Sequence, residues 1–220
     1  MASSSSNSRV SRDAPGSLDN AGTRAAILDA TAAIMVEEGY AAVTSRRVAE
    51  RAGQKSKLVH YYFATMDDLF VALYERSAAE HFQRHLEAVS SPNPLRALWE
   101  LSINPRQTRL AQEFIALSNH RSSVRKLTTR IVKQVNSLNI AFITKYLQEC
   151  GADLEEFPPV VISKILVGLS RNLVNEGAQD VHDGHAEVRT FAERWIERLE
   201  KMREAADLKR VTAVGADSRR

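Results

Sequence analysis

Apolar side chains recur at helical spacing along most of this chain. Within residues 23–38, Ile27, Ala30, Ile34 and Met35 fall on one side of a helix, and charged residues occupy the other side. The glycine that follows residue 38 is typical of a helix C-terminus. Similar spacing predicts helices over residues 45–52, 55–63, 65–90, 94–104, 106–119, 122–150, 160–176 and 186–206. We therefore predict an all-α fold of about nine helices.

Composition agrees with a helical protein and excludes several other classes. Only 9 of the 220 residues are glycine and 6 are proline, a balance that favours helices over a turn-rich sheet protein. No apolar run approaches the roughly 18 residues of a membrane span, so we expect a soluble, cytoplasmic protein with no membrane partner. Residues 1–20 are serine-rich and lack the apolar segment of a secretory signal, which predicts a disordered arm. Cys150 is the single cysteine, which excludes an internal disulfide and a cysteine-based zinc site.

Residues 44–63, TSRRVAERAGQKSKLVHYYF, predict two short helices joined at a glycine. Such a hairpin is a helix-turn-helix, whose second helix can enter the major groove of DNA. Its five cationic side chains and one acid give a net charge of +4, whereas the whole chain carries +3. The positive charge is therefore concentrated in this hairpin, and the other residues together are slightly acidic.

The second helix of the hairpin conflicts with two local rules of helix stability. Lys55 and Lys57 lie in its first turn, where cations oppose the helix dipole, and neither Gln54 nor Lys55 is a preferred N-cap residue. Such conflicts often mark functional sites, and a phosphate or base edge at this helix end would remove the conflict. The alternative is an ordinary helical hairpin with a solvated basic face.

Several motifs between residues 20 and 80 have the spacing of a known family. They are TRAAIL at 23–28, EGY at 38–40, Thr44, VA at 48–49, AG at 52–53, LVHYYF at 58–63 and DDL at 67–69. In these motifs the chain resembles the tetracycline-repressor (TetR/AcrR) family of transcriptional regulators. The remainder resembles the family only in its helical layout. Two positions depart from the family pattern, since Lys55 replaces the usual Ser or Thr and Lys57 replaces a frequent Gly or Pro.

The resemblance implies that eight residues of the hairpin contact DNA. Lysine bound to guanine O6 and N7 is a common specific contact, so we expect Lys57 to read the base sequence. Tyr62 stays open between a place in the core and a contact with the DNA backbone. Thr44, Ser45, Arg46, His60 and Tyr61 would approach phosphates, and Lys55, Ser56 and Lys57 would face base edges.

The resemblance also implies a homodimer, because two half-sites one helical turn apart require two copies of the reading helix. The family builds its dimer from the last two helices, here residues 160–176 and 186–206. The alternative is that their apolar residues form core within one chain. The candidate dimer residues are Val161, Leu166, Leu169, Leu173, Phe191, Trp195 and Leu199.

Between the reading hairpin and the dimer helices, the resemblance implies a mostly apolar pocket for a small effector. Asn136 and Asn139 interrupt an apolar stripe and would orient a ligand, the alternative being structural or solvent-facing asparagines. No histidine pair joins a carboxylate at metal-ligand spacing, so we predict no metal and no cofactor. The candidate effector-binding residues are Phe82, His85, Trp99, Ile103, Phe114, Ser118, Asn136, Asn139, Ile143, Arg171, Asn172 and Asn175.

Together these features predict a regulator and its domain organisation. Phosphate loops, nucleophile elbows and HExxH patterns are missing, which favours a protein that is not an enzyme. We predict a homodimeric repressor that leaves a palindromic operator on double-stranded DNA when a small, largely hydrophobic effector binds. The alternatives are an effector-independent DNA-binding regulator and a helical scaffold. The predicted parts are a disordered arm (1–20), a helix-turn-helix domain (21–66, motif about 43–62), a helical effector-binding and dimerisation domain (67–206) and a polar tail (207–220).

Overall fold

The computed structural model describes residues 16–217, and these residues form nine α-helices and one 3-10 turn, with no strand among them. The all-α prediction is therefore confirmed. The elements are α1 (Gly16–Glu38), η1 (Tyr40–Ala42), α2 (Ser45–Arg51), α3 (Ser56–Tyr62), α4 (Met66–Val89), α5 (Pro94–Ser102), α6 (Pro105–Ser118), α7 (Ser122–Glu149), α8 (Pro159–Gly177) and α9 (His185–Asp217).

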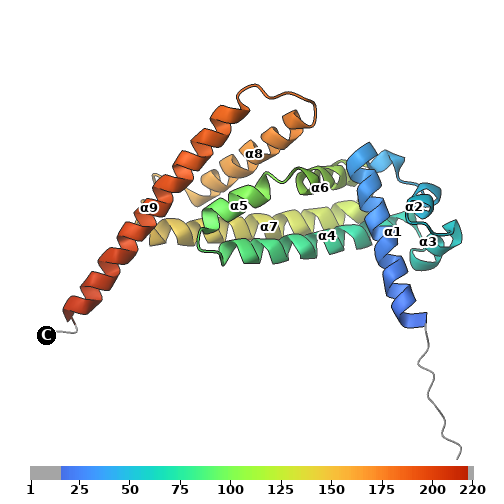
Figure 1. The fold of residues 1–220 in the computed structure, drawn as a ribbon, viewed down its shortest axis with the longest axis horizontal. Coiled ribbons are helices and arrows are strands. Elements are labelled where there is room, and N and C mark those ends of the chain that lie inside the picture. Colours follow the sequence, from blue (N-terminus) through green and yellow to red (C-terminus); the bar gives the residue numbers. More distant parts are fainter. Residues whose placement is uncertain (1–15, 218–220) are drawn as a thin grey trace, which may run out of the picture.

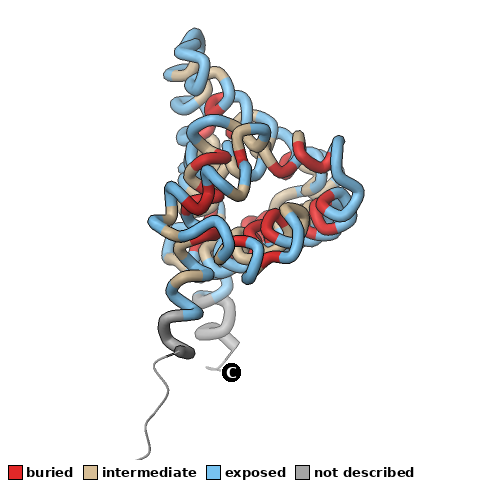
Figure 2. The backbone as a smooth tube through the Cα atoms, turned by 90° about the vertical axis from the view of Figure 1, so that its right-hand side faces the viewer, coloured by how far each residue is buried: buried red, intermediate tan, exposed pale blue. Residues whose placement is uncertain are grey.

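The helices form an elongated molecule with the N-terminal helices at one end. In Figure 1, α1, α2 and α3 lie at that end, and the long helices α4 and α7 run side by side away from them. The shorter helices α5 and α6 lie along this pair. Helices α8 and α9 pack against α5 and α7. Figure 2 shows the buried positions of the helices facing inward and the exposed positions on the outside.

Helices α1 and α9 extend beyond both predicted ends of the folded region. Helix α1 begins at Gly16, so residues 16–20 of the predicted arm are helical, and the Asn20 side chain accepts a hydrogen bond from the Tyr62 hydroxyl at 2.7 Å. At the other end α9 continues to Asp217 through most of the predicted tail. Arg210 ties this part of α9 to the end of α7, because its Nη2 donates to the Glu149 carbonyl at 2.9 Å. Residues 1–15 and 218–220 lie outside the described residues.

One apolar core joins the N-terminal helices to the long helices of the body. Its fully buried members come from both sides of the predicted domain boundary between residues 66 and 67. That boundary therefore falls inside a single packed unit, in which burial of each large side chain contributes about 1.5–3 kcal/mol. The core includes Ile34 and Met35 of α1, Val48 of α2, Val59 of α3, Leu69 and Phe70 of α4, Phe114 and Leu117 of α6 and Val124 of α7.

A second apolar core lies at the opposite end of the body. It is built from α5, α7, α8 and α9 together with the α7–α8 connection. The Cys150 thiol is buried in it and donates to the Leu199 carbonyl at 3.4 Å, and burial raises the pKa of that thiol. The second core includes Leu95, Trp99, Ile143, Tyr146, Leu147, Ile162, Leu173, Ile196 and Leu199.

Helix α6 is hydrogen-bonded to the segment that follows the end of α1. The Glu113 carboxylate accepts a hydrogen bond from the backbone N–H of Tyr40 at 2.7 Å, and the Tyr40 ring stacks on His120. Gly39 precedes this contact with φ of +86°, and a Cβ at this position would stand 3.5 Å from the Glu113 carboxylate. Positive φ strongly favours glycine, so the sequence expectation of a helix-ending Gly39 is confirmed.

We predict that Glu113→Ala lowers the melting temperature by about 3–12 °C. The variant loses a half-buried hydrogen bond to a charged group, worth about 1.5–3 kcal/mol, and leaves the Tyr40 N–H without its partner. Glu100→Ala removes an exposed glutamate from α5 and serves as the control, for which little change is expected. Differential scanning calorimetry compares the two variants, and equal melting temperatures would contradict this role of Glu113.

Candidate functional site

Helices α2 and α3 form the predicted helix-turn-helix. Thr44 caps α2, since its Oγ1 accepts from the Arg47 backbone N–H at 3.3 Å. Gly53 makes the turn with φ of +63°, and Lys55 precedes α3 without any capping bond from its side chain. The weak cap expected at this helix is therefore confirmed.

The inward side of the hairpin is apolar and fixes the angle between the two helices. Val48, Ala49, Val59 and Phe63 are buried in the first core. Tyr62 packs against the same core while its hydroxyl donates to Asn20, so its ring faces the protein interior. The side chains on the opposite face are thereby directed outward.

The outward side carries all eight residues expected to contact DNA. Tyr61 is 73% exposed, an unusual degree for a large aromatic ring, and its edge meets the ring of Tyr62 at 5.2 Å between centroids. Ser45 is half-buried. The remaining exposed members of the set are Thr44, Arg46, Lys55, Ser56, Lys57 and His60.

Two arginines of α2 are held by acids of α1. Arg47 Nη2 donates to both carboxylate oxygens of Glu38 at 2.5 Å, and this interaction lowers the pKa of the Glu38 carboxyl. Arg51 makes a similar contact with Glu37 at 2.6 and 2.7 Å. Two of the five cations in the hairpin therefore stabilise its position on α1.

The other three cations of the hairpin are Arg46, Lys55 and Lys57. All three are exposed, and none makes an ion pair with a residue that the structure describes. A surface charge that has no protein partner is available to a phosphate or a base edge. The pairing of Arg47 and Arg51 could not be read from charge counting, because it depends on where α1 ends.

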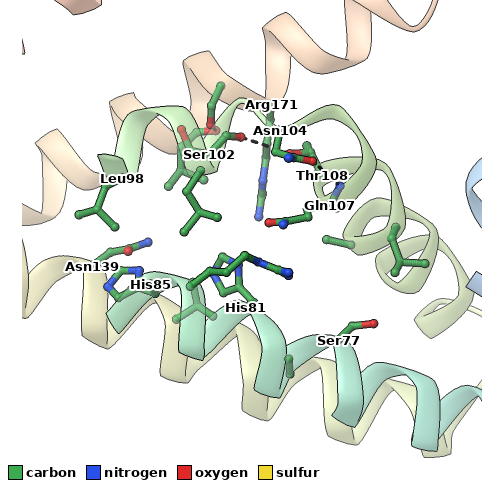
Figure 3. A pocket seen from close by; sticks show the side chains of 18 of the residues that line it. Ser77, His81, His85, Leu98, Ser102, Asn104, Gln107, Thr108, Asn139 and Arg171 are labelled. Carbon is green, nitrogen blue, oxygen red and sulfur yellow. Dashed lines mark hydrogen bonds between the residues drawn. The ribbon is translucent and has the colours of Figure 1, made fainter. Parts of the chain in front are cut away.

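A cavity of about 600 Å³ lies in the body between the two cores. Helices α4, α5, α6, α7 and α8 contribute most of its lining, and Figure 3 shows polar side chains from these helices around it. The volume is in the range of small-molecule sites. Seven of the residues predicted to bind an effector line this cavity, namely His85, Trp99, Phe114, Asn136, Asn139, Ile143 and Arg171.

The other five predicted effector residues do not line the cavity. Phe82 packs on the first core, and Ile103 packs on the second. Ser118 is buried and donates to the Ile115 carbonyl at 2.6 Å. Asn172 and Asn175 are exposed on α8, where Asn172 donates to Glu176 at 3.1 Å. Helical spacing alone had not distinguished neighbouring residues of α8, where Arg171 and Asn172 are both exposed but Arg171 lines the cavity and Asn172 does not.

Several polar residues of the cavity were missed from the sequence. Ser77 and His81 are two of them, and together with the predicted His85 they recur every four residues along α4, a spacing that places them on one face and could have indicated a polar stripe. Burial lowers the pKa of His81 to about 4, with smaller contributions from His85 and Arg84, and burial also lowers the pKa of His85. Both imidazoles are therefore neutral at pH 7.

The residues expected at a dimer contact divide into two groups. Val161 and Phe191 are 48% and 63% exposed, and they continue into the exposed Ile165 of α8 and Met202 of α9. Leu173 and Leu199 are buried in the second core, and Leu169 and Trp195 pack partly against it. Leu166 lines the cavity and also packs partly on that core. Part of the expected set thus belongs to the interior of one chain.

The described residues contain no group of three or more His, Cys, Asp or Glu side chains that could hold a metal ion. None of the helices in the described part of the chain is long and apolar enough to cross a membrane.

Residues 27–73 match the family model of bacterial regulatory proteins of the tetR family. The match spans the C-terminal half of α1, the whole hairpin and the start of α4. No curated protein sequence is significantly similar to the chain.

Solved structures share the fold of most of the chain at low sequence identity. A TetR transcription regulator from Haloarcula marismortui has a TM-score of 0.65 at 19% identity, covering 81% of this chain and 98% of its own. A putative transcriptional regulator from Saccharomonospora viridis in complex with choline has a TM-score of 0.65 at 18% identity, with coverages of 80% and 96%. The regulator FadR from Bacillus subtilis in complex with stearoyl-CoA has a TM-score of 0.56 at 18% identity, also with coverages of 80% and 96%.

The chain therefore matches the tetR family model over residues 27–73 and shares the all-helical fold of solved TetR-family regulators.

Proposed function

We propose that this protein is a homodimeric, cytoplasmic repressor that binds a palindromic operator and leaves it when a small, largely hydrophobic effector fills the cavity. The observation that carries the proposal is the pairing of charges in the hairpin. Arg47 and Arg51 hold α2 on α1, whereas Arg46, Lys55 and Lys57 face outward and make no ion pair with a described residue.

Each outward residue has a role in this proposal. Lys57 reads a base edge in the major groove, with Lys55 and Ser56 beside it. Arg46 binds phosphate from the start of α2, and the exposed Tyr61 contacts the backbone from α3. The remaining backbone contacts come from Thr44, Ser45 and His60.

A dimer supplies the second reading helix. One α3 reads too few base pairs for operator affinity, and two half-sites about 34–36 Å apart need a two-fold related partner. The exposed apolar side chains of α8 and α9, Phe191 among them, suit a contact with a second copy of the chain. We assign the dimer to Val161, Ile165, Phe191, Trp195 and Met202.

The effector role rests on the position of the cavity. Residues of both cores line it, and α6, which lines it too, is bonded to the end of α1 through Glu113. A molecule in this space therefore acts on the helices that hold the reading hairpin. Two regulators of the same fold, described above, were solved with small molecules bound.

The two alternatives fit the structure less well. A regulator that ignores effectors has no need for a cavity of this size, since side chains normally fill a core to high density. A helical scaffold has no need for three outward cations beside an exposed tyrosine on a reading helix.

Selection of duplexes from a random pool tests the proposed function. We expect the full-length protein to retain a palindromic sequence and to prefer it at least about a thousandfold over random DNA at about 150 mM salt. Equal affinity for random and selected duplexes would overturn the proposal.

We predict that Lys57→Ala and Arg46→Ala weaken DNA binding in different ways. Lys57→Ala should cost about 1–3 kcal/mol on the selected operator and relax the preference at one base pair. Arg46→Ala should weaken all duplexes alike and reduce the salt dependence. Lys133→Ala, at an exposed lysine of α7, is the control. Fluorescence anisotropy at several salt concentrations measures each affinity, and identical behaviour of the first two variants would contradict the assignment.

We predict that Phe191→Glu weakens the dimer at least about tenfold, because a carboxylate would replace the most exposed aromatic side chain of the apolar face on α9. Leu138→Glu, at an exposed leucine of α7, is the matched control and should leave the dimer intact. Sedimentation velocity gives the dissociation constants. A Phe191→Glu protein that stays fully dimeric would contradict the assigned interface.

A further inference from the structure

The cavity has a surplus of positive charge at one of its walls. Arg171 enters from α8 and points toward Gln107 of α6 and His81 of α4, as Figure 3 shows. It makes no ion pair or hydrogen bond with any residue in the described part of the chain. Arg171 is exposed to solvent as well as lining the cavity, so its guanidinium lies where the largely apolar cavity meets the surface. An arginine without a carboxylate partner at such a position can bind an anion.

The acids of the cavity are already paired elsewhere. Asp29 binds Arg76 at 2.7 Å, and Glu80 lies 3.7 Å from Arg76 and 3.9 Å from Arg84. With its amide oriented to satisfy its neighbours, Gln107 accepts from the Arg84 Nε at 2.9 Å and thereby occupies that guanidinium as well. Among the arginines that line the cavity, Arg171 and the exposed Arg106 are therefore the two that make no ion pair with a described residue.

The other polar groups around the cavity supply hydrogen-bond donors without adding charge. The side-chain Nε2 of Gln112 is buried and has no acceptor among the described residues. His81 and His85 are neutral at pH 7, because burial lowers the pKa of both. Burial raises the pKa of Tyr74, which also lines the cavity, and the positive charge of Arg171 opposes that rise.

We propose that the effector is an anionic amphipath, a carboxylate on a hydrocarbon chain, with Arg171 as the residue that binds its carboxylate. The inference rests on the proposed function, in that it takes the cavity as the effector site. The Gln112 amide satisfies a second oxygen, and the hydrocarbon lies against the apolar lining that includes Leu98, Trp99, Phe142 and Ile143.

A cationic effector would meet the wrong charges in this cavity. Its ammonium group would stand near an unpaired guanidinium, while both acids of the lining are engaged with arginines. A neutral amphipath would gain the apolar contacts but would leave the guanidinium without a counter-ion. We therefore expect an anionic amphipath to bind most tightly, a neutral one less tightly and a cationic one most weakly.

Three ligands of one chain length test this order, namely decanoate, decanol and decyltrimethylammonium below their micelle concentrations. Isothermal titration calorimetry with the full-length protein measures each affinity. We expect decanoate to bind about tenfold to a hundredfold more tightly than decanol, and the cation to bind most weakly. Binding of the cation as tight as that of decanoate, or no binding of decanoate, would overturn the inference.

Substitution of Arg171 locates the anion site. Arg171→Gln should abolish the preference for decanoate over decanol while leaving decanol affinity nearly unchanged, and Arg171→Lys should restore part of the preference. Arg189→Gln removes an exposed arginine of α9 outside the cavity and is the matched control. An Arg171→Gln protein that keeps the full preference would overturn the assignment of this residue.

The same proteins separate this inference from the proposed function. Operator binding is measured independently by anisotropy on the selected duplex. If the protein reads a palindrome but decanoate does not bind, the regulator stands and the anion site is wrong. If decanoate binds through Arg171 but no duplex is preferred, the anion site stands and the regulator is wrong.

Discussion

The apolar core shared by the reading hairpin and the body is the constraint on which the rest of the structure depends. Val48 and Val59 of the hairpin are buried in the same cluster as Phe70 and Phe114 of the body. Exposing even three such side chains would cost about 5–9 kcal/mol, comparable with the whole stability of a typical domain. The hairpin therefore cannot swing freely, and it follows any movement of α4 and α6.

Because of this constraint, a ligand in the cavity can act on the position of the reading hairpin. The cavity lies between the shared core and the second core, with Phe114 on one side and Trp99 and Ile196 on the other. Packed cores shift between discrete arrangements more readily than they deform, so a ligand that separates the two clusters would displace whole helices. The hydrogen bond from Tyr40 to Glu113 then carries a shift of α6 to the end of α1.

Helical spacing predicted the helices and the hairpin because each helix buries one continuous stripe and ends at a marked residue. Thr65 shows this, since its capping box with Asp68 is present at the start of α4. The ends of α1 and α9 were not predictable, because their extra turns depend on distant partners such as Tyr62 and Glu149. Arg171 could be placed in the cavity by resemblance, but its lack of a carboxylate partner emerged only from the packed structure.

The separation of the two recognition helices tests the central claim most directly. In a Cys150→Ala background, spin labels at Glu50→Cys report this distance in the dimer by double electron–electron resonance, since Glu50 is exposed on α2 and lies outside the expected DNA contacts. The account predicts a distance compatible with half-sites about 34–36 Å apart, and a shift of several ångströms when decanoate saturates the cavity. An unchanged distance with decanoate bound would contradict it.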